Sequence, residues 1–583
     1  SDPLDMYASN EMATTPMRTQ FNLGGANGAQ RMWPTVGYFD LDITARPTKD
    51  ISGSVDYRME KVFGQFWGQG DIAGVRWFNL HGDTPVGFDL GDFYYQNTPL
   101  TFWVPQDEYA FEPEVLAMKR DEGREEAEIQ GNSFPLQGAR ANTTLVLFDH
   151  LDLALNALGI RTAVAGNPNT SLPFGVTFPY DQYVFGGTAR FSGDHDKAFS
   201  LGFSYFNLQE SVDTALLSSA LTEQYSGVVG GDFRWDMGKH VSLHGEGAYS
   251  EYDPAYGAAA VVSWTAGGAG NLILDVKTRR NSLTLDGLYV DQQFINYEAQ
   301  TRDEDTADNF TGFMPTGDNL FNPYTGGYGL PNQSNLYFST YNNNIFATNQ
   351  GPRGGLVLNN GSQPGGIYLA PSPLNLSLPE GYATPDRAGF GGDYKGHWFG
   401  VGDGFVQPRL FGGIYTQPEV SYEVPSSVGR VAYERGGIGG TLDFANLGWA
   451  NLKLTAGVVS EDSKADNDVA FTSTRVAYDL DYEAFKNVTL MAGFEHVDMN
   501  GGDFWDYGAG PVYEWQNYAY DDYVAGIKWV LSKAASLYVS YSFDQFNNLD
   551  YGRRDLQSIQ PDLDIYSADT QTQEFEARMK VEF

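Results

Sequence analysis

The sequence predicts an all-β fold: a closed antiparallel β-barrel of about 20 strands, with 18 to 22 allowed, formed by a single domain over residues 1–583. Two observations carry this prediction. Apolar and polar residues alternate with a period of two in one segment after another, which places each set on its own face of a strand. Short turns and long polar connections also alternate along the whole chain, as they do when consecutive strands run up and down between two rims.

The composition excludes several classes of protein. Only 42% of the residues are hydrophobic, and no apolar run reaches the length of about 18 residues that a membrane-spanning helix needs. A membrane barrel produces no such run, because each lipid-facing residue alternates with a polar residue that faces the lumen. The formal net charge of −38 argues against nucleic acid as a partner, since phosphate binding needs a basic surface.

The first predicted hairpin illustrates the strand pattern. Phe39, Leu41 and Ile43 alternate with polar residues up to the turn Pro47–Asp50, and the chain returns through an apolar set that ends at Met59. The result is a hairpin with one apolar face and one charged face. The same unit recurs later in the chain, with apolar sets that begin at Leu151, Phe199, Val241, Val476, Tyr523 and Leu537.

The connections between the predicted strands are of two kinds. Short turns are predicted at Pro47–Asp50, Gly82–Thr84, Phe148–His150, Gly193–Asp196, Asp236–His240, Arg279–Asn281, Ala445–Ala450, Lys486–Asn487 and Ser532–Ala535. Long connections are predicted near residues 95–137, 164–182, 209–222, 294–428, 499–513 and 548–569. Three segments leave the strand count open: residues 15–24 as a weak first strand, Gly257–Thr278 as one strand or two, and Trp398–Val424 as a segment that could hide a further strand pair.

The last ten residues, EFEARMKVEF, give the clearest strand, and the chain stops on Phe583. This segment resembles the closing strand of a bacterial outer-membrane β-barrel, a family whose members commonly end in an aromatic residue that the barrel-assembly machinery reads. The resemblance implies the outer membrane of a Gram-negative cell, with lipid and lipopolysaccharide around the barrel and Phe583 as the assembly signal. The alternation predicts a lipid-facing set and a lumen-facing set, namely Phe575, Met579, Val581 and Phe583 against Glu576, Arg578 and Lys580.

The resemblance also sets the topology. If Phe583 lies at the periplasmic end of its strand, reversing the direction at every connection places each short turn on the periplasmic rim. Every long connection then lies on the extracellular side, which is the arrangement of outer-membrane barrels.

Two of the long connections exceed plain loops in length. Tyr95–Gln137 contains FEPEVLAMKRDEGREEAEI, in which Pro113 suits the first turn of a short, highly charged helix. This insertion is either a solvated surface helix or a segment that folds into the lumen as a constriction. The second insertion, Phe294–Val428, is rich in Gly, Asn, Pro and Tyr and is expected to be ordered. It is either a lid or inward plug, or a surface recognition loop.

Basic residues recur in the polar phase of the predicted strands, with Arg46 as the first of them. They resemble the arginine ladders that face acidic loops in general porins. The structural alternative is that each arginine pairs with a neighbouring carboxylate across the strand ladder. Together with two arginines of the first insertion, the pore-lining candidates are Arg58, Arg120, Arg124, Arg140, Arg190, Arg234, Arg475 and Arg578.

Metal, cofactor and catalytic sites are weakly indicated. Asp303, Asp305 and Asp308 offer oxygen ligands at spacings that a loop calcium site can use, but no Gly and no distal Glu complete an EF-hand loop. A solvated acidic loop is the favoured interpretation of this run. We therefore expect no cofactor, with calcium at acidic loops as the alternative. No Ser/His/Asp set stands out among so many loops, so we expect no enzyme.

The pattern favours a passive outer-membrane channel, either a porin or a substrate-selective diffusion pore for small hydrophilic solutes or ions. Charged inner faces imply a wet lumen, because a dry one would not hold so many ions. The 74 acidic against 36 basic residues predict a preference for cations. The alternative is a structural or assembly barrel that acts as a scaffold or sleeve for a surface or electron-conduit complex. A homo-oligomer or a surface partner protein is compatible with either function.

Overall fold

The structure is a computed structural model of the chain. It describes these residues: 4–10, 35–63, 72–103, 110–118, 133–148, 151–163, 180–193, 198–212, 223–256, 265–291, 293–294, 296, 356–358, 367–369, 387–400, 402, 404–416, 431–465, 470–501, 518–533, 535–548 and 569–581.

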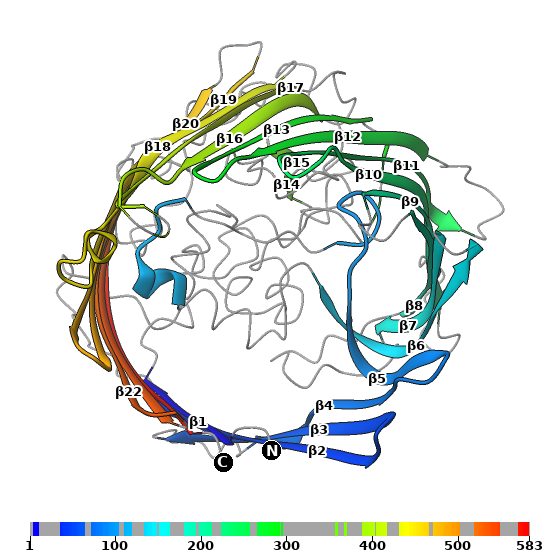
Figure 1. Cartoon of the computed structure of the whole chain (residues 1–583), viewed down its shortest axis with the longest axis horizontal. Coiled ribbons are helices and arrows are strands. Elements are labelled where there is room, and N and C mark those ends of the chain that lie inside the picture. Colours follow the sequence, from blue (N-terminus) through cyan, green and yellow to red (C-terminus); the bar gives the residue numbers. More distant parts are fainter. Residues whose placement is uncertain are drawn as a thin grey trace, which may run out of the picture.

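Twenty-two antiparallel strands form one sheet that returns on itself as a ring (Figure 1). Consecutive strands of the barrel pair with each other, with β13 pairing with β16, and β1 pairs with both β24 and β2, which closes the barrel. The predicted fold class is confirmed, with a strand number at the upper limit of the prediction. The barrel strands are β1 (Leu4–Asn10), β2 (Thr35–Thr48), β3 (Ile51–Phe63), β4 (Ile72–Gly82), β5 (Gly87–Tyr95), β6 (Phe134–Leu147), β7 (Leu151–Ala163), β8 (Tyr180–Gly193), β9 (Phe199–Val212), β10 (Glu223–Asp236), β11 (Val241–Tyr256), β12 (Thr265–Lys277), β13 (Asn281–Val290), β16 (Arg387–Gly396), β17 (Val406–Thr416), β18 (Val431–Asp443), β19 (Leu452–Ala465), β20 (Ala470–Phe485), β21 (Val488–Gly501), β22 (Tyr518–Ser532), β23 (Ala535–Asn548) and β24 (Asp569–Val581).

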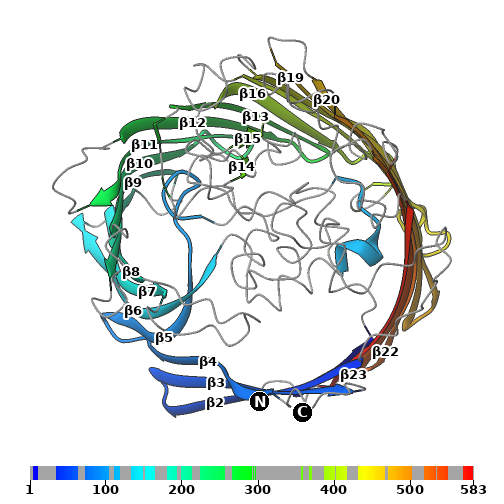
Figure 2. The same ribbon diagram turned by 180° about the vertical axis from the view of Figure 1, so that it is seen from behind.

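The connections divide between the two rims as the sequence predicts. On the rim where β24 ends, they range from two residues (49–50) to nine (397–405). On the other rim they are mostly long, up to the segment between β13 and β16, which contains the separate hairpin of β14 (Leu356–Leu358) and β15 (Ile367–Leu369). The shortest connection on that rim is β19–β20, residues 466–469, and the connections 64–71 and 257–264 have eight residues each. Figure 2 views the same ring from behind.

The faces of the strands identify the environment of the barrel. On β9, Phe203 is 51% exposed and its neighbour Ser204 only 7%. The exposed residues are therefore the apolar ones, the reverse of a soluble sheet. Across β20 to β23, outward rings contact each other in sequence, with centroid separations of 6.4 Å for Tyr478–Phe494, 4.9 Å for Phe494–Tyr523 and 6.2 Å for Tyr523–Phe543. An apolar exterior with aromatic rows is the surface of a transmembrane β-barrel of the outer-membrane type.

A search for membrane-spanning helices gives a negative result: among the described residues, no helix has the length and apolar character needed to cross a bilayer.

The predicted insertion 294–428 is wrong in its second half. Residues 387–416 form two barrel strands, β16 and β17, joined by a short turn that contains the bridge between Trp398 and Val406. Glycines in RAGFGGDYKG remove the side chains from which alternation is read, so β16 resembles a loop in sequence. Two other segments had left the strand count open. Gly257–Thr278 contains one described strand, β12. The first described strand is β1, and residues 15–24 lie outside the described residues.

Candidate functional site

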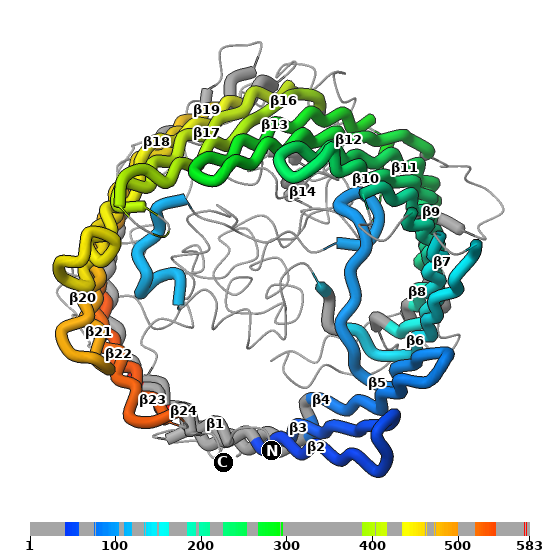
Figure 3. Tube along the Cα trace, viewed as in Figure 1, coloured from blue at the N-terminus to red at the C-terminus, as the bar shows by residue number. Residues whose placement is uncertain are grey.

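The connection between β5 and β6, which we call the inner loop, folds into the barrel. Its described parts are a first segment, residues 96–103, and a second segment, residues 110–118, of which 114–118 are helical. Figure 3 shows the two segments inside the ring, one near β10 and the other near β18 to β20. Residues 110–118 therefore lie inside the ring, with Val115 and Leu116 buried, and not on the outer surface (Figure 3). The charged run that follows, residues 119–132, lies outside the described residues, so its role in a constriction stays a prediction.

The first segment is fixed to the wall by polar contacts. The backbone N–H of Leu100 donates to Glu246 Oε1 at 3.1 Å, and Asn271 Nδ2 donates to the same oxygen at 2.8 Å. Asn296 Nδ2 donates to the carbonyl oxygens of Leu100 and Thr101 at 2.8 and 2.9 Å. These bonds satisfy backbone groups that the loop would otherwise bury unpaired.

An apolar cluster surrounds this segment. Leu100 and Phe102 are fully or almost fully buried against inward residues of strands β5 to β13. The Phe102 ring lies 5.2 Å from both the Tyr95 and the Phe206 rings. The inner wall is therefore not uniformly polar, and the apolar part is the part that the first segment covers.

The second segment contacts the other side of the barrel through a buried ion pair. Arg475 Nη1 lies 3.2 Å from Glu495 Oε2, and the two side chains are 5% and 3% exposed. The guanidinium also donates to the carbonyl oxygen of Ala110. The N–H of Glu114 donates to Asp479 Oδ1 at 3.1 Å. Residues more than 360 positions apart in sequence thus join the loop to β20 and β21.

Glycines on the inner wall make room for the second segment. The Phe111 ring lies where side chains at Gly439 and Gly457 would be. Two residues further, Pro113 covers Gly493 in the same way, and a Cβ at Gly526 would be 3.2 Å from Val115 Cγ2. Phe111 has a φ of 68°, a left-handed conformation that costs a non-glycine residue about 1–2 kcal/mol and persists only where packing holds it.

Pro113 begins the short helix as the sequence predicts. Its carbonyl oxygen accepts from the N–H groups of Leu116 and Ala117, both at 2.9 Å. Val115 and Leu116 are buried beside Met491, Val524 and Tyr538. The helix therefore packs an apolar face on β21 to β23.

Among the predicted arginines, Arg190 and Arg140 pair with carboxylates across strands. Arg190 Nη2 lies 2.8 Å from Asp232 Oδ1, although β9 separates their strands. The residue between them is Gly202, whose missing side chain leaves the space that the Asp232 carboxylate occupies. Arg140 contacts Asp89 at 3.9 Å, donates to Asn156 Oδ1 at 3.2 Å and stacks over the Tyr95 ring.

The remaining candidates differ in how far the structure describes them. Arg234 is more exposed and pairs with Asp236 at 3.1 Å, while Arg475 belongs to the buried pair above. Arg58 and Arg578 lie on β3 and β24, but their side chains are outside the described set. The inner-loop arginines, the acidic-loop calcium candidates and the terminal assembly signal lie wholly outside it, namely Arg120, Arg124, Asp303, Asp305, Asp308 and Phe583. Within the described residues, no group of three or more His, Asp or Glu side chains could hold a metal ion.

Sequence reasoning missed a basic cluster on β16 to β18. The guanidinium groups of Arg409 and Arg435 lie over the Phe411 ring, 5.2 and 5.3 Å from its centroid. Asp393 holds Arg409 through contacts of 2.8 and 3.2 Å, and Lys395 Nζ lies 3.6 Å from the same carboxylate. The sequence signal was weak, because polar and apolar residues alternate only from Gln407 to Leu410 before Phe411 and two glycines interrupt the pattern, and the stretch was assigned to the long insertion.

The two sides of the inner loop differ in charge. Asp479, Glu495 and Asp522 are buried on β20 to β22, with Asp481 one alternation further along β20. The Phe111 ring of the second segment lies 6.4 Å from Phe411, at the basic cluster. The loop therefore lies between an acidic and a basic part of the wall.

Known proteins are similar to this chain in three-dimensional structure and not in sequence. No protein-family model and no curated protein matches the sequence. The chain is similar to the FrpB iron transporter of Neisseria meningitidis, with 10% identity, a TM-score of 0.46, and coverage of 100% of this chain and 82% of that chain. It is also similar to a mutant of the ferric enterobactin receptor PfeA of Pseudomonas aeruginosa, with 12% identity, a TM-score of 0.45, and coverage of 100% of this chain and 80% of that chain. For OpdQ of the same species the identity is 11%, the TM-score 0.34, and the coverage 85% of this chain and 96% of that chain.

Proposed function

We propose that this barrel is an outer-membrane channel that passes small hydrophilic solutes or ions and prefers cations. The observation that carries the proposal is the inner loop, which is fixed to two separate parts of the inner wall, one largely apolar and one lined by acids. A ring of 22 strands spaced about 4.8 Å apart and tilted about 40° is roughly 40–45 Å across. A barrel of that width selects solutes only if something narrows it, and the inner loop supplies that element.

The preference for cations rests on the acids beside the second segment. Asp479 accepts a bond from the loop itself, and Asp481 shares its phase on β20. At about 8 Å in screened water, one carboxylate changes the local potential energy of a monovalent ion by about 0.2 kcal/mol. The effect is opposite for the anion, so each carboxylate contributes about a two-fold change in the cation-to-anion permeability ratio.

The test is the reversal potential of the purified protein in a planar bilayer under a KCl gradient. Cation selectivity is expected, and it should weaken as ionic strength rises. Replacing Asp479 and Asp481 together by Asn should lower the permeability ratio by up to about four-fold, the full effect requiring both neighbouring carboxyls to be ionised. The matched control is Asp498→Asn, which removes the same kind of charge from the exposed outer phase of β21 and should leave the ratio unchanged. An anion-selective sign would refute the preference.

The second candidate function is a structural or assembly barrel, a scaffold or sleeve for a surface or electron-conduit complex. The observation that favours it is the apolar cover that the first segment places over strands β5 to β13, because an open pore does not need a large apolar core. Complete absence of conductance from correctly folded protein would support it. Surrounding lipid and lipopolysaccharide, and recognition of Phe583 by the barrel-assembly machinery, are proposed for either function.

A further inference from the structure

The wall of the barrel has a weak junction between β4 and β5. These strands share four register pairs, from Asn79–Gly91 to Gly82–Phe88. The other neighbouring barrel strands that the structure describes share six to fourteen. Beyond the Asn79–Gly91 pair, on the side away from the turn, Ile72–Phe78 of β4 pairs with β3 alone and Asp92–Tyr95 of β5 pairs with β6 alone. We call these two stretches the β4/β5 seam, which lies next to the connections 64–71 and 96–133.

Two backbone irregularities build the seam. Gly91 has a φ of 100°, and a Cβ there would collide with the carbonyl oxygen of Phe78. Glycine is needed at this point because β5 turns away from β4. On β4, one extra residue between Val75 and Trp77 shifts the register against β3. Bulges of this kind redirect a strand and end its pairing.

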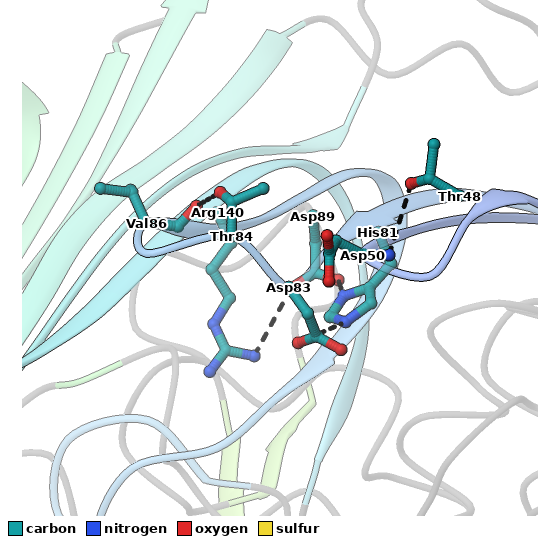
Figure 4. A network of polar contacts seen from close by, with 8 residues as sticks. All are labelled: Thr48, Asp50, His81, Asp83, Thr84, Val86, Asp89 and Arg140. Carbon is teal, nitrogen blue, oxygen red and sulfur yellow. Dashed lines mark hydrogen bonds and ion pairs between the residues drawn. The ribbon is translucent and has the colours of Figure 1, made fainter.

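Between the seam and the β4–β5 turn, side-chain contacts hold β4 and β5 together. The ring of His81 lies 2.8 Å from Asp89 and 3.2 Å from Asp83, and Arg140 of β6 approaches Asp89 as well (Figure 4). Ion pairs and ladder bonds therefore fix β4 and β5 next to their turn. Any separation of the two strands is confined to the seam.

Side chains take the place of the missing ladder. The Trp77 and Tyr94 rings stack across the seam with centroids 4.8 Å apart. The N–H of Phe78 donates to Asp92 Oδ2 at 2.7 Å, and Asn79 Nδ2 donates to the carbonyl oxygen of Asp92 at 2.7 Å. Parting two fully paired strands in lipid would leave many backbone groups without partners, which hydrocarbon does not tolerate. Parting the two rings breaks no ladder bond.

The surfaces on both sides of the ring pair are apolar. Val75 and Phe78 are 62% and 51% exposed on the lipid side of β4. On β5, Phe93 and Tyr95 are buried in the apolar cluster of the inner wall. We propose that the β4/β5 seam is a lateral portal, through which an apolar molecule passes between the lumen and the surrounding lipid, with the Trp77–Tyr94 pair as its closure. This activity goes beyond the proposed hydrophilic path.

A reversible cross-link tests the portal. The chain contains no cysteine, so Trp77→Cys with Tyr94→Cys introduces a single thiol pair. The pair is joined by a reducible bismethanethiosulfonate with a two-carbon spacer in Gram-negative cells that express the protein. The readout is uptake of the apolar dye N-phenyl-1-naphthylamine. We expect the cross-link to reduce uptake to the level of cells without the protein, and reductant to restore it several-fold above that level.

Two controls make the result specific. Cross-linking Tyr478→Cys with Phe494→Cys, on the fully paired strands β20 and β21, should leave dye uptake unchanged. The seam cross-link should also leave ion conductance unchanged, which separates failure of the portal from failure of the proposed channel. Should the double variant not fold, Tyr94→Ala alone should raise dye uptake without changing conductance. Uptake that is indifferent to the seam cross-link, or equal to that of cells without the protein, would overturn the proposal.

Discussion

Replacing Arg475 by Met should strongly destabilise the barrel and release the second segment of the inner loop. The guanidinium and the Glu495 carboxylate are 3.2 Å apart and almost completely buried, so the change leaves one unpaired charge inside the protein. Removing one partner of such a pair costs about 3–5 kcal/mol. The bond to the carbonyl oxygen of Ala110 is lost as well, so the single-channel conductance should rise. The free energy of unfolding can be measured by guanidinium titration in lipid vesicles, with tryptophan fluorescence as the signal.

Two comparisons isolate the buried charge. Arg234→Met removes an arginine whose side chain is 56% exposed and should cost about 0–1 kcal/mol, as exposed pairs do. Arg475→Met combined with Glu495→Leu removes both charges and should recover most of the loss, because apolar replacement of a buried pair is often neutral. If Arg475→Met costs no more than Arg234→Met and leaves the conductance unchanged, the second segment is not held in the way described.

Three further outcomes follow from the same geometry. Met579→Arg should lower the free energy of unfolding by about 2–4 kcal/mol if the residue lies near the bilayer midplane, because its side chain is exposed on the lipid face. Arg at Glu576, in the opposite phase of the strand, should be tolerated. Equal losses of stability for the two variants in vesicle unfolding would reverse the assignment of the two faces. Cysteines introduced in Gln333–Asn344 should react with an impermeant maleimide on intact cells, because this segment follows β13 on the long-loop rim. Labelling only after the periplasm is opened would show that the assigned topology is the wrong way round. Gly202→Val should disrupt the ion pair between Asp232 and Arg190, because the new Cβ would collide with the Asp232 carboxylate. The free energy of unfolding in the guanidinium titration should fall by about 1–3 kcal/mol. No loss of stability would show that the carboxylate moves aside freely.

Much of the fold could be predicted because a lipid-facing strand leaves an alternating pattern. The apolar set that begins at Phe199 continues through Leu201, Phe203 and Tyr205 and was assigned to one face of β9. Its three aromatic members are about half exposed and Leu201 is partly exposed. The pattern fails where residues lack side chains, as in the Gly-rich strand β16. The pairing of Ala110 with Arg475 could not be predicted, since loop docking leaves no period in the sequence. Likewise, the weak β4/β5 junction depends on the backbone at Gly91, which residue types alone do not reveal.

Glycine in the lumen phase is nevertheless a signal of loop docking that sequence analysis can use. Gly439, Gly457, Gly493 and Gly526 all occupy the inner phase of their strands, on β18, β19, β21 and β22. Glycine weakens a strand, so four such positions in neighbouring strands need a reason. Left uncovered, they would expose bare backbone to the water of the lumen. Covered by the side chains of 111, 113 and 115, which alternate along the second segment, they become a groove whose shape fits the loop. The wall and the inner loop are therefore complementary in shape, and in the proposed channel the acids beside that groove are the ones best placed to set its selectivity.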